Sequence, residues 1–235
     1  MAIADELQPA HDLEEREPRL STALALAEEI HAPQKDKASG VPYVVHPIRV
    51  ANAVLDAGGT IEQAQAALLH DAIEDGGPKW RPNVREFGEV VAEIVRVCSD
   101  AEPTDGKKDP WRKRKVEHVN RLRAGVLADA YLVVAADKLD AVTRTLSAVL
   151  RSGDAFWSED IFKGGRLGTV WYYRSMSEIV SHHLPDTPIA EELAESVLKL
   201  TDAAGLDGLS VEEMLTRATN TAWPEGIKAG EGGPS

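Results

Sequence analysis

The sequence predicts an all-α protein built as a helical bundle. Apolar residues recur at spacings of three and four, as Leu20, Ala23, Leu24, Ala27 and Ile30 do, and this spacing places them on one face of a helix. No segment shows the alternation of Val, Ile and Thr that a β-hairpin requires. Stretches rich in Gly and Pro separate the helical segments, as expected for the turns of a bundle.

Each of the first helices has a local boundary signal. Pro33 ends the first helix, and a loop over residues 34–42 follows it. Pro47 suits the first turn of a second helix. Thr60 can cap a third helix, which we expect to run from Ile61 to about Asp75. The later predicted helices cover residues 84–99, 111–125, 126–150, 169–183, 188–204 and 210–221. The third of these is the most apolar, and we expect it to be the central buried helix.

Length and composition indicate one globular domain. The chain has 235 residues, of which 43% are hydrophobic, and this content supports a sizeable core. We expect an N-terminal arm over residues 1–17, with room for a short helix, a single domain over 18–222 and a disordered tail over 223–235. The single cysteine, Cys98, excludes an intramolecular disulfide.

The net charge of the chain limits the kinds of partner that it can bind. The net charge of −13 argues against general binding to nucleic acid or to an anionic membrane, because phosphate binding needs clustered positive charge. A small local basic patch can still bind a small anionic ligand. No N-terminal signal pattern and no apolar run long enough to span a bilayer is present, so we expect a cytoplasmic protein.

A cluster of ionisable residues follows the apolar pair Leu68-Leu69. Within six residues the chain carries His70, Asp71, Glu74 and Asp75, at spacings that place them on one side of the predicted helix. A histidine and three carboxylates set into an apolar helix are costly unless something compensates their charge. A bound divalent cation would do so, and the cluster therefore indicates a metal site.

Two further residues are candidate ligands for the same ion. His46 precedes Pro47 at the start of the second helix, and Asp137 lies inside the most apolar segment of the chain. Imidazole and carboxylate ligands together suit Mn²⁺, Fe²⁺ or Zn²⁺ better than Mg²⁺ or Ca²⁺. A plainer explanation stays open, because a lone His-Asp pair arises by chance and Asp137 can pair with Lys138.

The order of these motifs resembles that of HD-domain metal-dependent phosphohydrolases. The match is closer still to the hydrolase domain of RelA/SpoT-type alarmone enzymes and to the stand-alone small alarmone hydrolases. Three segments carry the resemblance: Gly40-Val-Pro-Tyr-Val-Val-His-Pro47, Ala66-Ala-Leu-Leu-His-Asp-Ala-Ile-Glu-Asp75 and Ala136-Asp-Lys-Leu139. The residues His31, Gln34 and Lys37 also resemble the first motif of that family.

The resemblance implies an HD-domain helical bundle that hydrolyses a nucleotide with the help of one metal ion. The implied ion is Mn²⁺, with Fe²⁺ or Zn²⁺ as alternatives, and its implied ligands are His46, His70, Asp71 and Asp137. Glu74 and Asp75 would position and activate the attacking water. The implied reaction of the stringent response is removal of the 3′-pyrophosphate of (p)ppGpp.

A further set of residues is predicted to contact the nucleotide. These residues are Lys37, Tyr43, Arg112, Lys115, Lys138 and Arg144. The chain departs from the family pattern where Asp36 replaces an expected Arg and Ala141 replaces a common Asn, so guanine selectivity is open. The same site can instead serve a phosphatase acting on NADPH, (p)ppApp or a nucleoside monophosphate, or a non-catalytic nucleotide sensor. The oligomeric state is not readable from the sequence.

Overall fold

The computed structural model describes residues 11–36, 39–100, 109–157 and 163–220, and its all-α architecture confirms the predicted fold class. Within these ranges no strand forms, and the only β contact is an isolated antiparallel bridge between Lys35 and Pro42. In chain order the helices are α1 (His11–His31), α2 (Val45–Asp56), α3 (Ile61–Leu69), α4 (Ala72–Gly76), the 3₁₀ turn η1 (Pro78–Trp80), α5 (Arg81–Arg85), α6 (Glu89–Cys98), α7 (Trp111–Arg123), α8 (Ala130–Ser152), the 3₁₀ turn η2 (Gly153–Trp157), α9 (Gly165–His183), α10 (Pro188–Ala203) and α11 (Val211–Asn220).

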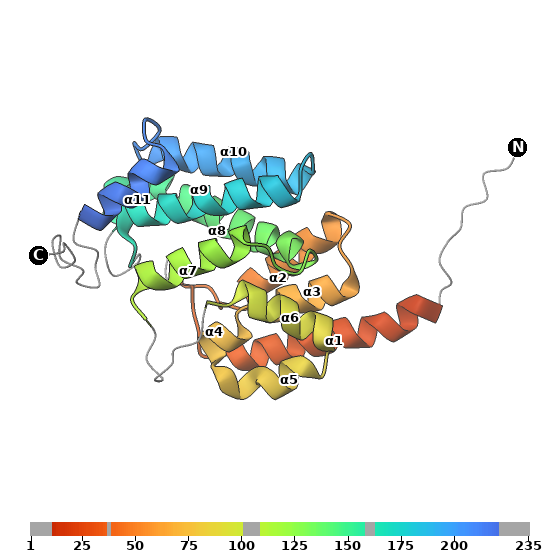
Figure 1. Cartoon of the computed structure of the whole chain (residues 1–235). Helices are drawn as coiled ribbons and strands as arrows, with labels where there is room; N and C mark the ends of the chain where they lie inside the picture. Colours follow the sequence, from red (N-terminus) through yellow and green to blue (C-terminus); the bar gives the residue numbers. More distant parts are fainter. Residues whose placement is uncertain (1–10, 37–38, 101–108, 158–162, 221–235) are drawn as a thin grey trace, which may run out of the picture.

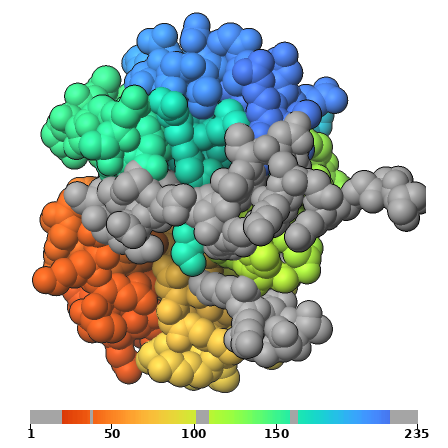
Figure 2. Space-filling view, turned by 90° about the vertical axis from the view of Figure 1, so that its left-hand side faces the viewer, coloured from red at the N-terminus to blue at the C-terminus, as the bar shows by residue number. Residues whose placement is uncertain are grey.

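Helix α8 lies between two groups of helices (Figure 1). On one side it contacts α2, α3 and α6 of the N-terminal group, and on the other it contacts α9 and α10 of the C-terminal group. The space-filling view in Figure 2 shows the two groups as an orange and yellow lower half and a teal and blue upper half. Residues from opposite ends of the chain therefore meet along α8.

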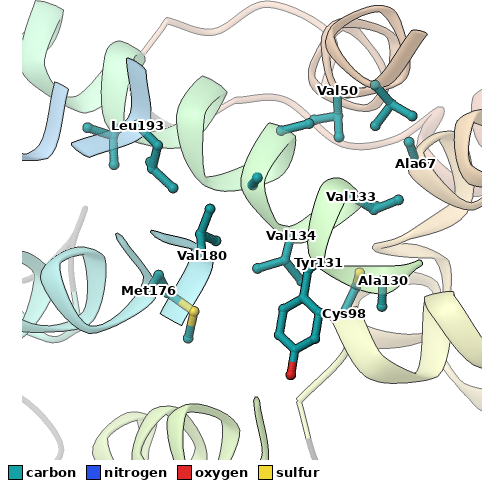
Figure 3. Packing of buried hydrophobic residues seen from close by; sticks show 14 of the residues in the cluster. Val50, Ala67, Cys98, Ala130, Tyr131, Val133, Val134, Met176, Val180 and Leu193 are labelled. Atoms are coloured by element: carbon teal, nitrogen blue, oxygen red, sulfur yellow. The ribbon is translucent and has the colours of Figure 1, made fainter. Parts of the chain in front are cut away.

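The core follows from the position of α8. Val133 and Val134 are both fully or almost fully buried, although they point to different sides of the helix, because each side is covered. Figure 3 shows the side chains that cover α8: Val50 and Ala67 from the N-terminal group, and Met176, Val180 and Leu193 from the C-terminal group. Each of the buried Val, Leu and Met side chains contributes about 1.5–3 kcal/mol. The prediction of a central buried helix is confirmed, with its start at Ala130 rather than at Val126.

The predicted cap of the third helix is present. Thr60 Oγ1 accepts a hydrogen bond from the backbone N–H of Gln63 at 3.2 Å, and the Gln63 side chain accepts one from the backbone N–H of Thr60 at 2.8 Å. This reciprocal pair is a capping box. It fixes the start of α3 at Ile61, as expected.

The end of the same helix differs from the prediction. The segment expected to run to about Asp75 is two helices, because a turn at His70 and Asp71 separates α3 from the five-residue α4. Asp71 has φ −93° and ψ 0°, which is bridge-region backbone. The inference that a continuous helix aligns the four ionisable residues is therefore wrong.

Two other boundaries also differ. The predicted helix 84–99 is divided into α5 and α6, since Gly88 adopts φ +109°, which glycine tolerates best. Helix α1 begins at His11, so residues 11–17 of the expected arm are helical. The predicted tail over residues 223–235 lies outside the described residues. None of the helices in the described ranges combines the length and the hydropathy of a membrane span.

Candidate metal centre

Three separate elements bring the candidate ligands together. His46 lies in the first turn of α2, His70 in the turn after α3 and Asp137 in the N-terminal half of α8. All three are buried, and one ligand atom from each lies within 4.8 Å of the others. Nε2 of His46 is 3.3 Å from Asp137 Oδ1, and Nε2 of His70 is 3.7 Å from the same oxygen.

Asp71 adds a fourth group to this cluster. Its Oδ2 lies 3.1 Å from His70 Nε2 and 3.8 Å from His46 Nε2. The same oxygen accepts a hydrogen bond from the Tyr43 hydroxyl at 2.6 Å. Tyr43 therefore orients a candidate ligand, a role that is separate from the nucleotide contact predicted for it.

The surroundings of His70 fit a cation. Its Nδ1 lies 2.7 Å from the carbonyl oxygen of Ala67, which makes Nδ1 the donor and turns Nε2 toward the carboxylates. Among the described residues, this buried Nε2 has no hydrogen-bond partner of good geometry. Burial alone would lower the pKa of His70, but the charges of Asp71 and Asp137 outweigh it and raise the pKa to about 9. The site thus attracts a positive charge, which a divalent ion can supply in place of the proton.

Asp137 uses its two oxygens differently. Oδ2 is 2.5 Å from Lys138 Nζ, while Oδ1 faces the two histidines. Burial would raise the pKa of Asp137, yet Lys138 and His46 hold it well below its usual range. The simple pairing of Asp137 with Lys138 that the sequence left open therefore occurs, and it leaves one oxygen for an ion.

A pocket of about 200 Å³ opens beside the cluster. Its lining includes five of the six residues predicted as ligands or catalytic acids, and four predicted nucleotide contacts. The lining residues are Tyr43, His46, Asp71, Glu74, Asp75, Cys98, Lys115, Asp137, Lys138, Ala141 and Arg144. A larger cavity of about 470 Å³, lined mainly by α5 and α6, holds none of the predicted site residues.

Two predicted nucleotide contacts are not among the described residues that line this pocket. Arg112 does not line it, and Lys37 lies outside the described residues. The structure does bring Lys115 and Lys138 to the pocket, where each ammonium lies over the Tyr172 ring, at 5.2 and 5.4 Å from its centroid. Two cations beside the carboxylates suit a phosphorylated ligand.

A charged network beside Glu74 was missed by sequence reasoning. Asp100 hydrogen-bonds Arg114, and its two oxygens lie 3.0 and 3.1 Å from Lys115 Nζ. Arg114 Nη1 is in turn 3.5 Å from Glu74 Oε1. Burial would raise the pKa of Asp100, but Lys115 and Arg114 lower it to about 2. The only sequence signal was the basic run 111–115, which does not reveal its acidic partner.

In the part of the chain that the structure describes, helices alone form the scaffold, and they surround a buried His-His-Asp cluster that could hold a metal ion. These features are those of a helical metalloprotein. The family model described as HD domain matches residues 23–161, which is more than half of the chain, and the chain belongs to this family. All four candidate ligands fall inside the matched segment.

Relatives of known name share part of this segment. The chain is 31% identical over 125 residues to guanosine-3′,5′-bis(diphosphate) 3′-pyrophosphohydrolase of Aquifex aeolicus. The aligned segment covers 52% of this chain and 17% of that protein. It is 33% identical over 110 residues to the bifunctional (p)ppGpp synthase/hydrolase SpoT of Escherichia coli K12, which covers 47% of this chain and 15% of SpoT. The chain thus spans under one fifth of the length of these relatives.

Two solved structures are similar in fold. A metazoan ortholog of SpoT, described as hydrolysing ppGpp, superimposes with a TM-score of 0.58 at 23% identity, covering 80% of this chain and 96% of that one. A protein of Listeria monocytogenes EGD-e superimposes with a TM-score of 0.55 at 28% identity, covering 65% of this chain and 96% of that one. The first likeness shows the shared fold alone.

Proposed function

We propose that this protein is a metal-dependent hydrolase that removes the 3′-pyrophosphate from a (p)ppGpp-like nucleotide. The observation that carries the proposal is the buried cluster of His46, His70 and Asp137 at a pocket that also presents carboxylates and lysines. The names of the relatives support the substrate class. Cytoplasmic location and the lack of nucleic-acid or membrane partners stay predictions.

One ion would be held by the two histidines together with Asp71 and Asp137. The buried Nε2 of His70, which has no hydrogen-bond partner of good geometry among the described residues, and the inward Oδ1 of Asp137 support this ligand set. Mn²⁺ is the proposed ion, and Fe²⁺ and Zn²⁺ are the alternatives with the same ligand preference. When bound, the ion supplies a lowered pKa for a water molecule and polarises a phosphoryl oxygen.

Glu74 is the proposed general base. Its carboxylate lines the pocket and is 20% exposed, so it can accept a proton from a water molecule there. The water oxygen forms a bond to the phosphorus attached to the 3′ oxygen, and the bond between that phosphorus and the 3′ oxygen breaks. The 3′ oxygen takes up a proton, which Glu74 can return, so the nucleotide keeps a 3′-hydroxyl and pyrophosphate leaves. Asp75, on the same short helix, is proposed to orient the water.

The cations of the pocket are proposed to bind the phosphates. Lys115 and Lys138 act as point charges, and Arg144 lines the same pocket. Lys37 and Arg112 stay proposed contacts on the strength of the family resemblance alone. Because Asp36 pairs with Arg144 and stands where an Arg was expected, an adenine nucleotide remains an alternative substrate.

A substrate panel tests the reaction. Wild-type protein loaded with Mn²⁺ is incubated with ppGpp, ppApp and NADPH, and the products are separated by ion-exchange chromatography. Release of pyrophosphate from ppGpp is the expected result. Release of orthophosphate alone supports the phosphatase alternative, and no release from any compound supports the sensor.

A matched pair of variants tests the base. Glu74→Gln should lower hydrolysis by about 10²–10⁴-fold and leave the Mn²⁺ dissociation constant unchanged, because Glu74 is not a proposed ligand. Glu93→Gln, which loses an exposed ion pair with Arg96, should leave both unchanged. Wild-type rates in the Glu74 variant would show that the proton goes elsewhere.

A further inference from the structure

The ring nitrogen of His46 that faces away from the pocket has its own carboxylate partner. Nδ1 lies 2.6 Å from Asp140 Oδ2, while Nε2 lies 3.3 Å from Asp137 Oδ1. Both carboxylates belong to α8, about one turn apart. The imidazole is therefore held at both nitrogens by one helix, which fixes the plane of the ring.

The partner of Nδ1 determines which nitrogen carries the proton. Arg144 Nη2 also approaches Nδ1, but at 3.3 Å, whereas the carboxylate of Asp140 lies at 2.6 Å. The shorter contact favours Nδ1 as the donor to Asp140. Nε2 is then left with a lone pair directed toward the cluster, as a metal-binding histidine requires.

Asp140 is itself held by a second ion pair. Arg144 Nε lies 2.7 Å from Asp140 Oδ2, one turn further along α8. Asp140 and Arg144 have side chains that are 12% and 29% exposed, so water screens this pair only in part. Arg49 also approaches Asp140, but at 3.8 Å and with a side chain that is 51% exposed, which makes it the weaker partner.

The far end of Arg144 reaches a loop in another part of the chain. Nη1 lies 2.5 Å from Asp36 Oδ2. The other oxygen of Asp36 accepts hydrogen bonds from the backbone N–H and the hydroxyl of Ser39, both at 2.7 Å. Ser39 thus holds Asp36, and Asp36 holds Arg144. Arg144 in turn contacts Asp140, which contacts His46.

We propose that Asp36, Arg144 and Asp140 form a positioning chain that sets the metal affinity of His46. Asp36 and Asp140 are positioning residues, since neither lines the pocket and each acts through a neighbour. Removing the carboxylate behind a metal-binding histidine costs about 10–100-fold in affinity. This inference rests on the metal site of the proposed function and adds that the contact between Asp36 and Arg144 affects how tightly the ion is held.

Calorimetric titration of the metal-free full chain with Mn²⁺ tests the chain of contacts without any substrate. Asp140→Asn should weaken binding about 10–100-fold, and Asp36→Asn about threefold because it acts through Arg144. The control is Asp109→Asn, which breaks an ion pair of the same spacing, with Lys113, outside the pocket. It should bind Mn²⁺ as the wild type does.

The double variant distinguishes positioning from a general loss of structure. If the residues act in one chain, Asp36→Asn adds little to Asp140→Asn, whereas independent structural effects would multiply. Multiplied effects, or wild-type affinity in Asp140→Asn, overturn the inference and leave the proposed function standing. A wild-type chain that binds no Mn²⁺, Fe²⁺ or Zn²⁺ overturns the metal site itself. If circular dichroism shows Asp140→Asn to be unfolded, Asp36→Asn on its own decides, and wild-type affinity there refutes the chain.

Discussion

Replacing Asp100 by Asn tests how strongly the network beside Glu74 stabilises the fold. The Asp100 side chain is only 4% exposed and contacts both Arg114 and Lys115. Burial would raise its pKa, but these two cations lower it from 3.8 to about 2. Each pKa unit corresponds to about 1.4 kcal/mol, so the shift corresponds to about 2 kcal/mol of stability at neutral pH. Asp100→Asn should lower the free energy of unfolding by at least about 2 kcal/mol, because the amide does not neutralise the two cations.

The pH dependence of this effect has a definite sign. The pKa of Asp100 is lower in the folded than in the unfolded chain, so its contribution is complete above about pH 5 and is lost as the pH falls through about 2. At about pH 3 roughly half of it remains. The difference between wild type and variant should therefore shrink from about 2 kcal/mol at pH 7 to about 1 kcal/mol at pH 3.

Urea unfolding followed by tryptophan fluorescence measures both values, since the chain has five tryptophans. The control is again Asp109→Asn, whose exposed pair with Lys113 should be worth less than about 1 kcal/mol at either pH. Equal unfolding midpoints for wild type and Asp100→Asn at pH 7, or a difference that does not change with pH, would refute the reasoning.

Three further predictions concern the scaffold. Thr60→Ala removes the capping box and should lower the free energy of unfolding, measured with urea, by about 1 kcal/mol. Thr143→Ala on the exposed side of α8 should lower it by less than about 0.5 kcal/mol. Equal decreases would contradict the stabilising effect of the cap. Gly59→Ala would place a Cβ atom 2.6 Å from Val54 Cγ1 and 2.8 Å from the Val54 carbonyl oxygen, so it should lower stability by about 1–3 kcal/mol, and an unchanged melting temperature would contradict that packing. Cys98 is buried and burial raises the pKa of its thiol, so Ellman's reagent should label it only after unfolding, and rapid labelling of the native protein would contradict its burial.

Local patterns predicted much of the scaffold. The cap at Thr60 depends on residues three positions apart, and the burial of α8 follows from an apolar run, so both signals lie within a short stretch of sequence. The turn at His70 and Asp71 was missed because apolar residues continue at helical spacing on both sides of it. A period of 3.6 residues reports which positions face the core and does not report a break of one or two residues.

The partners within the site were beyond local patterns. His46 and Asp140 are 94 residues apart along the chain, and Arg144 and Asp36 are 108 residues apart. Arg144 was predicted from the family resemblance as a nucleotide contact, and nothing in its neighbourhood along the chain indicated Asp36. Such pairs exist only because α8 lies against the N-terminal helices, which is a property of the packed fold.

Because the proposed ligands lie far apart along the chain, the stability of the folded protein would depend on the supply of the ion. An unfolded chain cannot present ligands from α2 and α8 at once, so an ion held by them binds only the native state. Binding to the native state alone adds about 2.7 kcal/mol of stability when the free ion is at about a hundred times its dissociation constant. When the ion is scarce, a larger fraction of the chain would be unfolded and open to proteases. Metal starvation would therefore lower the amount of the protein as well as the rate of its proposed reaction.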